Sequence, residues 1–193
     1  MLTINSKENK TKSQDGALLK LYYKLEEARA TEKLTSFNII RYLPLKSGFQ
    51  IKIGGLYGFI SIKDMPWEYA RRSFWKSAAP YLTEKRFKGR IAELSSKPLS
   101  IRVSIDKSVP AKPRLARKML YKGVILHKTP QYLVIDLGVY SDWKSGSVIG
   151  IAYRHSYTNE KMFDHLNIGE TCHSSFHGLT KKEIPILEIR NVI

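Results

Sequence analysis

The chain has 193 residues, of which 42% are hydrophobic and 11% aromatic, a composition that excludes a disordered protein and allows one large or two small domains. Its 33 Lys and Arg residues outnumber 17 Asp and Glu residues, giving a net charge of +16. Such an excess favours a polyanionic partner, because cations that displace counterions from phosphates gain affinity for nucleic acid. No apolar run approaches the roughly 18 residues of a membrane span. The N-terminus does not resemble a signal peptide, and the single Cys172 indicates a reducing compartment, so we expect a cytoplasmic protein without membrane contact.

The N-terminal third of the chain divides into a tail, a helix and the start of a β-rich block. Residues 1–16 are polar and predict a flexible tail, whereas Leu18, Leu19, Tyr22 and Leu25 recur at helical spacing and predict a helix over 17–33. A protein partner docking on helix 17–30 is left open. Residues 34–106 then predict a first barrel with a helical segment from Pro66 onward. Its expected strands are 37–43, 49–53, 58–62, 87–94 and 99–105.

The second half of the chain repeats this organisation after a basic linker. Residues 107–118 hold two prolines and several cations without acids, which is typical of a linker that contacts phosphates. Residues 119–193 predict a second barrel, with an insertion over 139–146 in its hairpin. Pairs such as Gly54 and Gly138, Tyr69 and Tyr153, and Leu82 and Leu166 lie 84 residues apart. The expected strands are 121–127, 132–137, 147–153, 171–178 and 184–189.

The fold class that follows is mainly β, with two tandem five-stranded OB-fold barrels and an N-terminal α-helix. One larger β-sandwich is the alternative. Residues 54–67 read Gly-Gly-Leu-Tyr-Gly-Phe-Ile-Ser-Ile-Lys-Asp-Met-Pro-Trp and resemble the S-one RNA-binding domain, an OB module of a small-subunit ribosomal protein. The resemblance is clearest over 49–67, and 119–193 resemble a more divergent copy. The matching residues are Gly54, Gly55, Gly58, Ile62, Asp64, Met65 and Trp67.

This resemblance implies RNA binding, although it carries over only some of the family's contact residues. Gln50 stands where the family has a base-stacking aromatic, with Phe49 one place away, and Ser61 replaces its histidine. Arg102 retains the basic residue of the last strand. Tyr153 takes the histidine position in the second copy, whose inserted hairpin is expected to expose Tyr140 and Trp143. The predicted nucleic-acid-binding residues are Phe49, Phe59, Arg71, Arg72, Lys88, Arg90, Arg102, Lys112, Arg114, Arg117, Lys118, Tyr140, Trp143, Lys144 and Tyr153.

The sequence therefore favours a non-catalytic nucleic-acid-binding protein that takes single-stranded or loop RNA, with single-stranded DNA left open. The rival interpretation is a structural adaptor whose barrels contact proteins within a larger assembly. No nucleotide-binding loop, nucleophile elbow or paired-carboxylate pattern indicates an enzyme. No cofactor or metal is expected, because His173 and His177 share one face of a strand and Cys172 points to the other.

Overall fold

The computed structural model describes residues 5–106, 114–144, 146–155 and 160–192. These form two compact units that do not follow the chain in simple succession. Unit 1 comprises residues 1–65 and 86–106, and unit 2 comprises residues 66–85 and 107–193. The segment 66–85, which the sequence assigned to the first barrel, thus belongs to unit 2.

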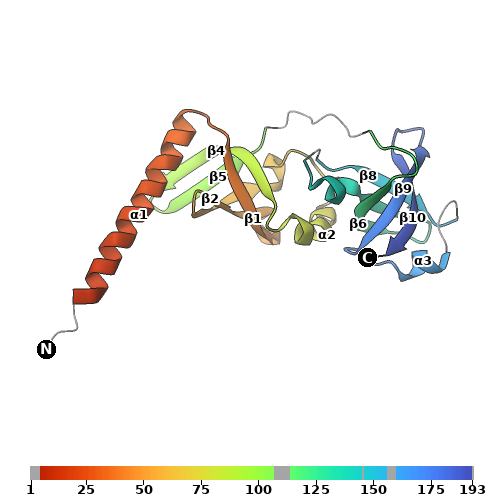
Figure 1. The fold of residues 1–193 in the computed structure, drawn as a ribbon, viewed down its shortest axis with the longest axis horizontal. Helices are drawn as coiled ribbons and strands as arrows, with labels where there is room; N and C mark the ends of the chain where they lie inside the picture. The colour runs from red at the N-terminus through yellow and green to blue at the C-terminus, as the bar shows by residue number, and fades with distance from the viewer. Residues whose placement is uncertain (1–4, 107–113, 145, 156–159, 193) are drawn as a thin grey trace. The chain divides into compact units, whose positions relative to one another are not determined.

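Unit 1 is a closed five-stranded sheet with a long helix packed against it (Figure 1). Strand β1 pairs with β2 and β4, β2 pairs with β3, and β4 pairs with β5, all antiparallel. The ring is completed by a parallel pairing of β3 with β5 at Phe59 and Arg102. The strands are β1 (Thr35–Leu43), β2 (Gly48–Ile53), β3 (Leu56–Ser61), β4 (Arg86–Ser96) and β5 (Leu99–Ser104), with two 3₁₀ turns, η1 (Pro44–Lys46) and η2 (Ile62–Asp64).

A two-residue turn fixes the register between β2 and β3. Gly54 and Gly55 have φ values of +56° and +90°, the left-handed conformation that a tight hairpin turn requires at both positions. Helix α1 (Asn5–Ala30) packs on this turn: Leu25 is 2% exposed, and a Cβ built on Gly54 would meet its Cδ2 at 3.0 Å. The helix begins at Asn5 rather than at residue 17, so it extends over residues expected to form a tail.

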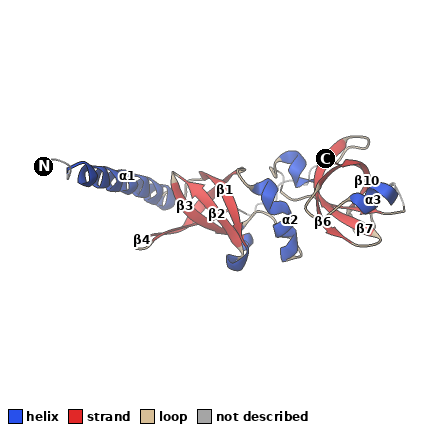
Figure 2. Ribbon diagram, turned by 90° about the horizontal axis from the view of Figure 1, so that it is seen from below, coloured by secondary structure: helices blue, strands red, loops and turns tan. Residues whose placement is uncertain are grey.

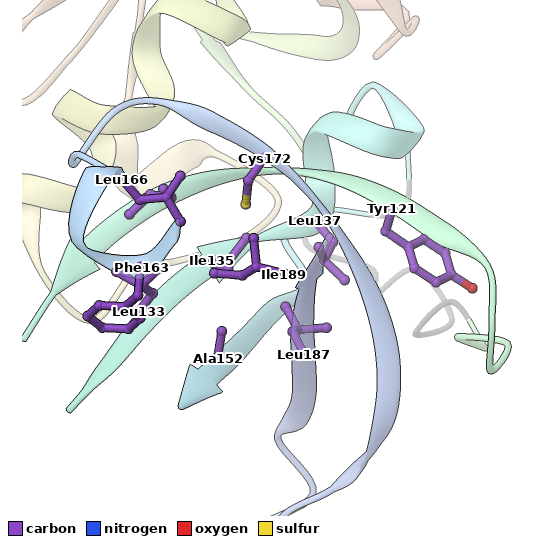
Figure 3. Packing of buried hydrophobic residues seen from close by; sticks show 11 residues of the cluster. Tyr121, Leu133, Ile135, Leu137, Ala152, Phe163, Leu166, Cys172, Leu187 and Ile189 are labelled. Carbon is purple, nitrogen blue, oxygen red and sulfur yellow. The ribbon is translucent and has the colours of Figure 1, made fainter. Parts of the chain in front are cut away.

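Unit 2 repeats the same pairing scheme with strands β6 (Leu120–Lys128), β7 (Tyr132–Asp136), β8 (Ile149–Tyr153), β9 (Thr171–Leu179) and β10 (Pro185–Val192). Its parallel closure joins Ile186 of β10 to Ile151 of β8. Helix α3 (Glu160–His165) lies between β8 and β9 in the chain, and the 3₁₀ turn η3 (Leu137–Ser141) follows β7. Figure 3 shows the interior, where side chains such as Leu133, Ile135 and Leu187 meet around Cys172.

The segment 66–85 joins unit 2 because its aromatic rings pack there. It contains helix α2 (Arg72–Leu82), which the sequence predicted as a helical segment. Trp67 stacks between Trp75, with ring centroids 5.7 Å apart, and Trp143, 6.3 Å away. Trp67 therefore packs in unit 2 and not in the first barrel. Met65 does lie buried in unit 1, with no exposed surface.

A buried carboxylate completes this contact within unit 2. Asp136 has no exposed surface, and it accepts hydrogen bonds from the Tyr69 hydroxyl, from the Trp143 Nε1–H at 3.2 Å, and from the backbone N–H groups of Gly138 and Val148 at 2.8 and 2.9 Å. Burial raises the pKa of Asp136 above its usual value, and burial together with the charge of Asp136 raises the pKa of Tyr69. Four donors thus converge on a single side chain.

Each predicted strand overlaps an observed strand, and the internal repeat holds at most of its landmarks. In the sheet of unit 1, Gln50 pairs with Phe59, and the corresponding pair in unit 2 is Val134 with Ile151. Gln50 and Val134 lie 84 residues apart. Tyr69 and Tyr153 do not correspond, because Tyr69 precedes α2 whereas Tyr153 ends β8. Because the insertion over 139–146 precedes β8, the offset in residue number between β3 and β8 exceeds 84 by the length of the insertion.

Candidate nucleic-acid interface

Two aromatic side chains project from the outer face of β3. Residues of this strand alternate in burial: Leu56 and Ile60 are buried in the barrel, whereas Tyr57 and Phe59 point outward. Tyr57 is 59% exposed, the kind of large exposed ring that a folded barrel has no structural need for. Rings two residues apart on a strand lie about 7 Å apart along it. Each can therefore receive a separate planar group.

The Phe59 ring lies across a glycine on the neighbouring strand. A Cβ built on Gly48 of β2 would stand 2.3 Å from Phe59 Cζ and 2.4 Å from the backbone oxygen of Ile60. No larger residue fits at position 48 without moving the backbone. Because the ring is supported on this side by the glycine, it is held flat against the sheet and remains partly exposed.

A row of polar and cationic residues crosses the sheet from Tyr57. The register places Tyr57 beside Lys52 of β2, Lys52 beside Asn38 of β1, and Asn38 beside Arg86 of β4. Figure 2 shows β1, β2 and β3 as neighbouring strands of this face. Lys52 and Arg86 are exposed, and Lys88 follows Arg86 on the same face of β4. At about 4.8 Å between strands, the row spans about 14 Å.

A second row passes through Phe59 and contains two arginines of different availability. Arg41 of β1 donates from Nε to Gln50 Oε1 at 2.7 Å, a neutral partner, and no acidic side chain of the described residues forms an ion pair with it. Arg102 of β5 instead donates to Asp64 at 3.1 and 3.2 Å and to Glu93 at 2.9 Å. The hydrogen bond and charge of Asp64 raise the pKa of Arg102. Two carboxylates thus offset the charge of Arg102, which contributes less to the potential of this face than Arg41.

Four of the predicted residues, Phe59, Lys88, Arg90 and Arg102, lie on the outer surface of the unit 1 sheet, and the register places Phe59 beside Arg102. Arg90 is exposed and donates from Nη1 to Asp106 at 3.5 Å. The prediction for Phe49 is wrong. Its ring has no exposed surface, because β2 turns Phe49 into the barrel core against Tyr42, with ring centroids 5.1 Å apart. A ring buried there has no face for a base.

The other predicted nucleic-acid-binding residues that the structure describes lie in unit 2. Tyr140 is 51% exposed, edge-on to Tyr121, and the half-buried Tyr153 is edge-on to Tyr132. Arg71 Nη1 lies 3.4 Å from His127 Nε2, so this arginine is turned toward β6. Lys112 lies outside the described residues. The other predicted cations of unit 2 are exposed: Arg72, Arg114, Arg117, Lys118 and Lys144.

The prediction that Trp143 stands on an exposed tip is wrong. The residue is 2% exposed, because the inserted segment folds back on itself. Asp142 and Trp143 adopt positive φ values of 51° and 54°, and the Trp143 N–H donates to Gly138 O at 2.8 Å. This turn directs the indole toward Trp67 and Asp136, so only Tyr140 and Lys144 of the predicted set remain at the surface of the insertion.

Four residues of the unit 1 face were missed: Arg41, Lys52, Tyr57 and Arg86. The signal for two of them was present in the sequence. A two-residue Gly-Gly turn pairs the residues on either side at equal distance from it, which places Lys52 opposite Tyr57 and Gln50 opposite Phe59. Arg41 and Arg86 had no such signal, because their places depend on a β-bulge in β1 and on the long-range pairing of β1 with β4.

Charge alone does not select a unit. Unit 1 carries 16 Lys and Arg residues against eight Asp and Glu residues, and unit 2 carries 17 against nine, so each has a net charge of +8. The combination of exposed rings with uncompensated cations selects the outer face of unit 1. Among the described residues, no three His, Cys, Asp or Glu side chains gather to hold a metal ion. No helix in the described part of the chain is long and apolar enough to cross a membrane.

Comparison with known proteins identifies no family for this chain: no family model matches it, and no curated protein does. Among solved structures, the chain is similar to a multidomain protein with nucleic acid binding domains from Streptococcus pneumoniae, at 10% identity and a TM-score of 0.36. The match covers 82% of this chain and 51% of that one, so this chain spans about half the length of that protein. The function proposed below rests on this chain's own residues.

Proposed function

We propose that this protein binds single-stranded nucleic acid, RNA in preference to DNA, on the outer face of β1, β2 and β3 in unit 1. The observation that carries the proposal is the pair of outward rings, Tyr57 and Phe59, beside the cations Lys52 and Arg41, which form no ion pair with the residues that the structure describes. Bases stack on such rings for about 1–3 kcal/mol each, and lysine and arginine contact the phosphates between them. We further propose that both units are OB-type barrels related to the S-one domain, because strand order and pairing are the same in each.

Single strands are favoured over a duplex because stacking on a side chain requires an unpaired base. The preference for RNA rests on the resemblance over 49–67 and on polar groups such as Gln50 beside the rings, which can bond a ribose 2′-hydroxyl. Catalysis is not part of the proposal. The carboxylates of this face, Asp64 and Glu93, are both bonded to Arg102, an arrangement that positions a side chain rather than transfers a proton.

The test is a fluorescence-anisotropy titration of the full chain with a labelled single-stranded RNA, the same sequence as DNA, and the duplex, each at two salt concentrations. We expect the order RNA, DNA, duplex in affinity, with affinity falling steeply as salt rises. Tyr57→Ala should weaken RNA binding about 5- to 150-fold, the loss of one stacked base. Tyr23→Ala is the matched control, since Tyr23 is 57% exposed, close to the 59% of Tyr57, but belongs to α1 and not to the sheet. Equal affinity of Tyr57→Ala and Tyr23→Ala for RNA would exclude this face as the site.

The second candidate function is an adaptor that contacts proteins. It is favoured by one specific observation, the aliphatic outer face of unit 2 described next, and it is compatible with nucleic-acid binding by unit 1. If no nucleic acid binds the chain at low salt, the adaptor function alone remains.

A further inference from the structure

Corresponding positions on the outer faces of the two barrels carry different kinds of side chain. In unit 1 the register pairs Gln50–Phe59 and Lys52–Tyr57 form the outer face, and Phe59 is joined to Arg102. The corresponding pairs in unit 2 are Val134–Ile151 and Asp136–Ile149, and Ile151 is joined to Ile186. Asp136 is buried under the inserted segment, so the outer face consists of half-buried aliphatic side chains. Because unit 2 has neither exposed rings nor cations at these positions, it does not repeat the nucleic-acid site proposed for unit 1.

A groove opens at one end of this aliphatic face. It encloses about 790 Å³, and its wall is apolar over most of its length. Leu179, at the end of β9, lies in the wall and is 56% exposed, so a large apolar side chain is available to a partner there. The other apolar residues of the wall are Leu115, Val148, Ile149, Phe176, Ile184 and Pro185.

Beside the groove, β8 and β10 are joined by a short parallel pairing. The register pair between β8 and β10 is Ile186 with Ile151, and the preceding residue of β10 is Pro185, which has no N–H to donate. Ile149, two residues before Ile151 on β8, lies in the groove wall. An extended peptide that fills the groove would contact Ile149 of β8.

Cations border the groove. Arg114 and Lys182 line it, and Lys181 is exposed beside them, against the single acid Glu183. We propose that this groove binds an extended peptide segment of a partner protein, with aliphatic side chains in the groove and acidic residues flanking them. The aliphatic wall selects the centre of the peptide, and the cationic border selects its flanks. The chain would then hold nucleic acid on unit 1 and a protein on unit 2.

The test is selection of a random decapeptide library on the full-length protein, with counterselection on Leu179→Glu, followed by anisotropy titrations of the enriched peptides. We expect enriched peptides with a cluster of aliphatic residues flanked by Asp or Glu. Leu179→Glu and Lys182→Glu should each weaken them by about tenfold or more, a change of about 1.4 kcal/mol. Ile168→Glu is the matched control, since Ile168 is 53% exposed in the same unit but outside the groove.

Both groove substitutions replace exposed residues, so the variants should fold as the wild type does, and circular dichroism checks this. Three results would overturn the proposal: no enrichment above the Leu179→Glu background, enriched peptides without acidic flanks, or equal binding to Leu179→Glu and Ile168→Glu. Loss of RNA binding in Leu179→Glu would assign the groove to nucleic acid instead. Retention of peptide binding in Tyr57→Ala shows that the two sites are independent.

Discussion

Replacing Asp136 by Asn tests whether the buried hydrogen bonds of this side chain stabilise unit 2. The introduced amide retains one oxygen, which can accept from the Gly138 and Val148 N–H groups as Asp136 Oδ1 does. Its NH₂ group then faces Tyr69 and Trp143. The Tyr69 hydroxyl can rotate to accept a hydrogen bond, but the Trp143 indole N–H is a donor only and is left buried without an acceptor. One such orphaned donor costs about 1–3 kcal/mol, so Asp136→Asn should destabilise unit 2 by that amount.

The assay is urea unfolding followed by tryptophan fluorescence, because the three tryptophans of the chain, Trp67, Trp75 and Trp143, all belong to unit 2. Asp164→Asn is the control: Asp164 is 54% exposed and pairs with Arg154 at 2.8 Å, a surface contact worth about 0–1 kcal/mol. If Asp136→Asn and Asp164→Asn unfold at the same urea concentration, the buried hydrogen bonds of Asp136 do not stabilise unit 2.

The stability difference between wild type and Asp136→Asn should also depend on pH, and the direction of this dependence follows from the burial of Asp136. Because burial raises the pKa of Asp136 in the folded state, the unfolded chain gives up this proton at lower pH than the folded chain does. The part of the stability that comes from this protonation is therefore complete below the unfolded pKa of Asp136 and is lost as the pH rises through the raised folded pKa. The stability difference between wild type and Asp136→Asn should shrink over that interval. A difference that grows with rising pH would contradict this assignment.

Three further predictions concern the rings, the charges and the thiol. Gly48→Ala places a methyl group 2.4 Å from the Ile60 backbone oxygen and should destabilise unit 1 by about 1–3 kcal/mol while weakening RNA binding, whereas Gly16→Ala, with nothing within 4 Å, should do neither. Lys52→Ala should lower the slope of log affinity against log salt by about 0.7, the value for one phosphate contact on a single strand, and Lys20→Ala on α1 should leave it unchanged. Burial raises the pKa of Cys172 to about 12, so a thiol reagent at neutral pH should modify it only after unfolding in urea, and rapid modification of the native protein would refute its burial.

Local patterns in the sequence were sufficient to predict the strands of both units and the hairpin of unit 1. The alternation of Leu56, Tyr57 and Phe59 places two rings on one face, and the Gly54-Gly55 turn pairs them with Lys52 and Gln50. These signals act within a few residues, because the backbone geometry of a strand and a two-residue turn leaves one register. The five-strand count of both units also followed from the repetition of the same local signals.

Burial of a particular ring could not be predicted in the same way. The polar residues around Trp143 indicated an exposed tip, but its two positive-φ residues fold the tip inward. A turn of this kind is stabilised by contacts with Trp67, far away in the sequence, and no local pattern reports such a contact.

The sequence by itself determined that the chain builds two similar five-stranded sheets and that its charge suits a polyanion, because both are properties of local pattern and composition. Only the tertiary structure decided which face combines rings with uncompensated cations, since Arg102 is offset by Asp64 and Glu93 whereas Arg41 is not. It also decided that segment 66–85 belongs to unit 2, because the stacking of Trp67 and the hydrogen bond of Tyr69 to Asp136 join residues that are distant along the chain. Such contacts depend on how the chain returns to itself in space, which periodicity and composition do not encode.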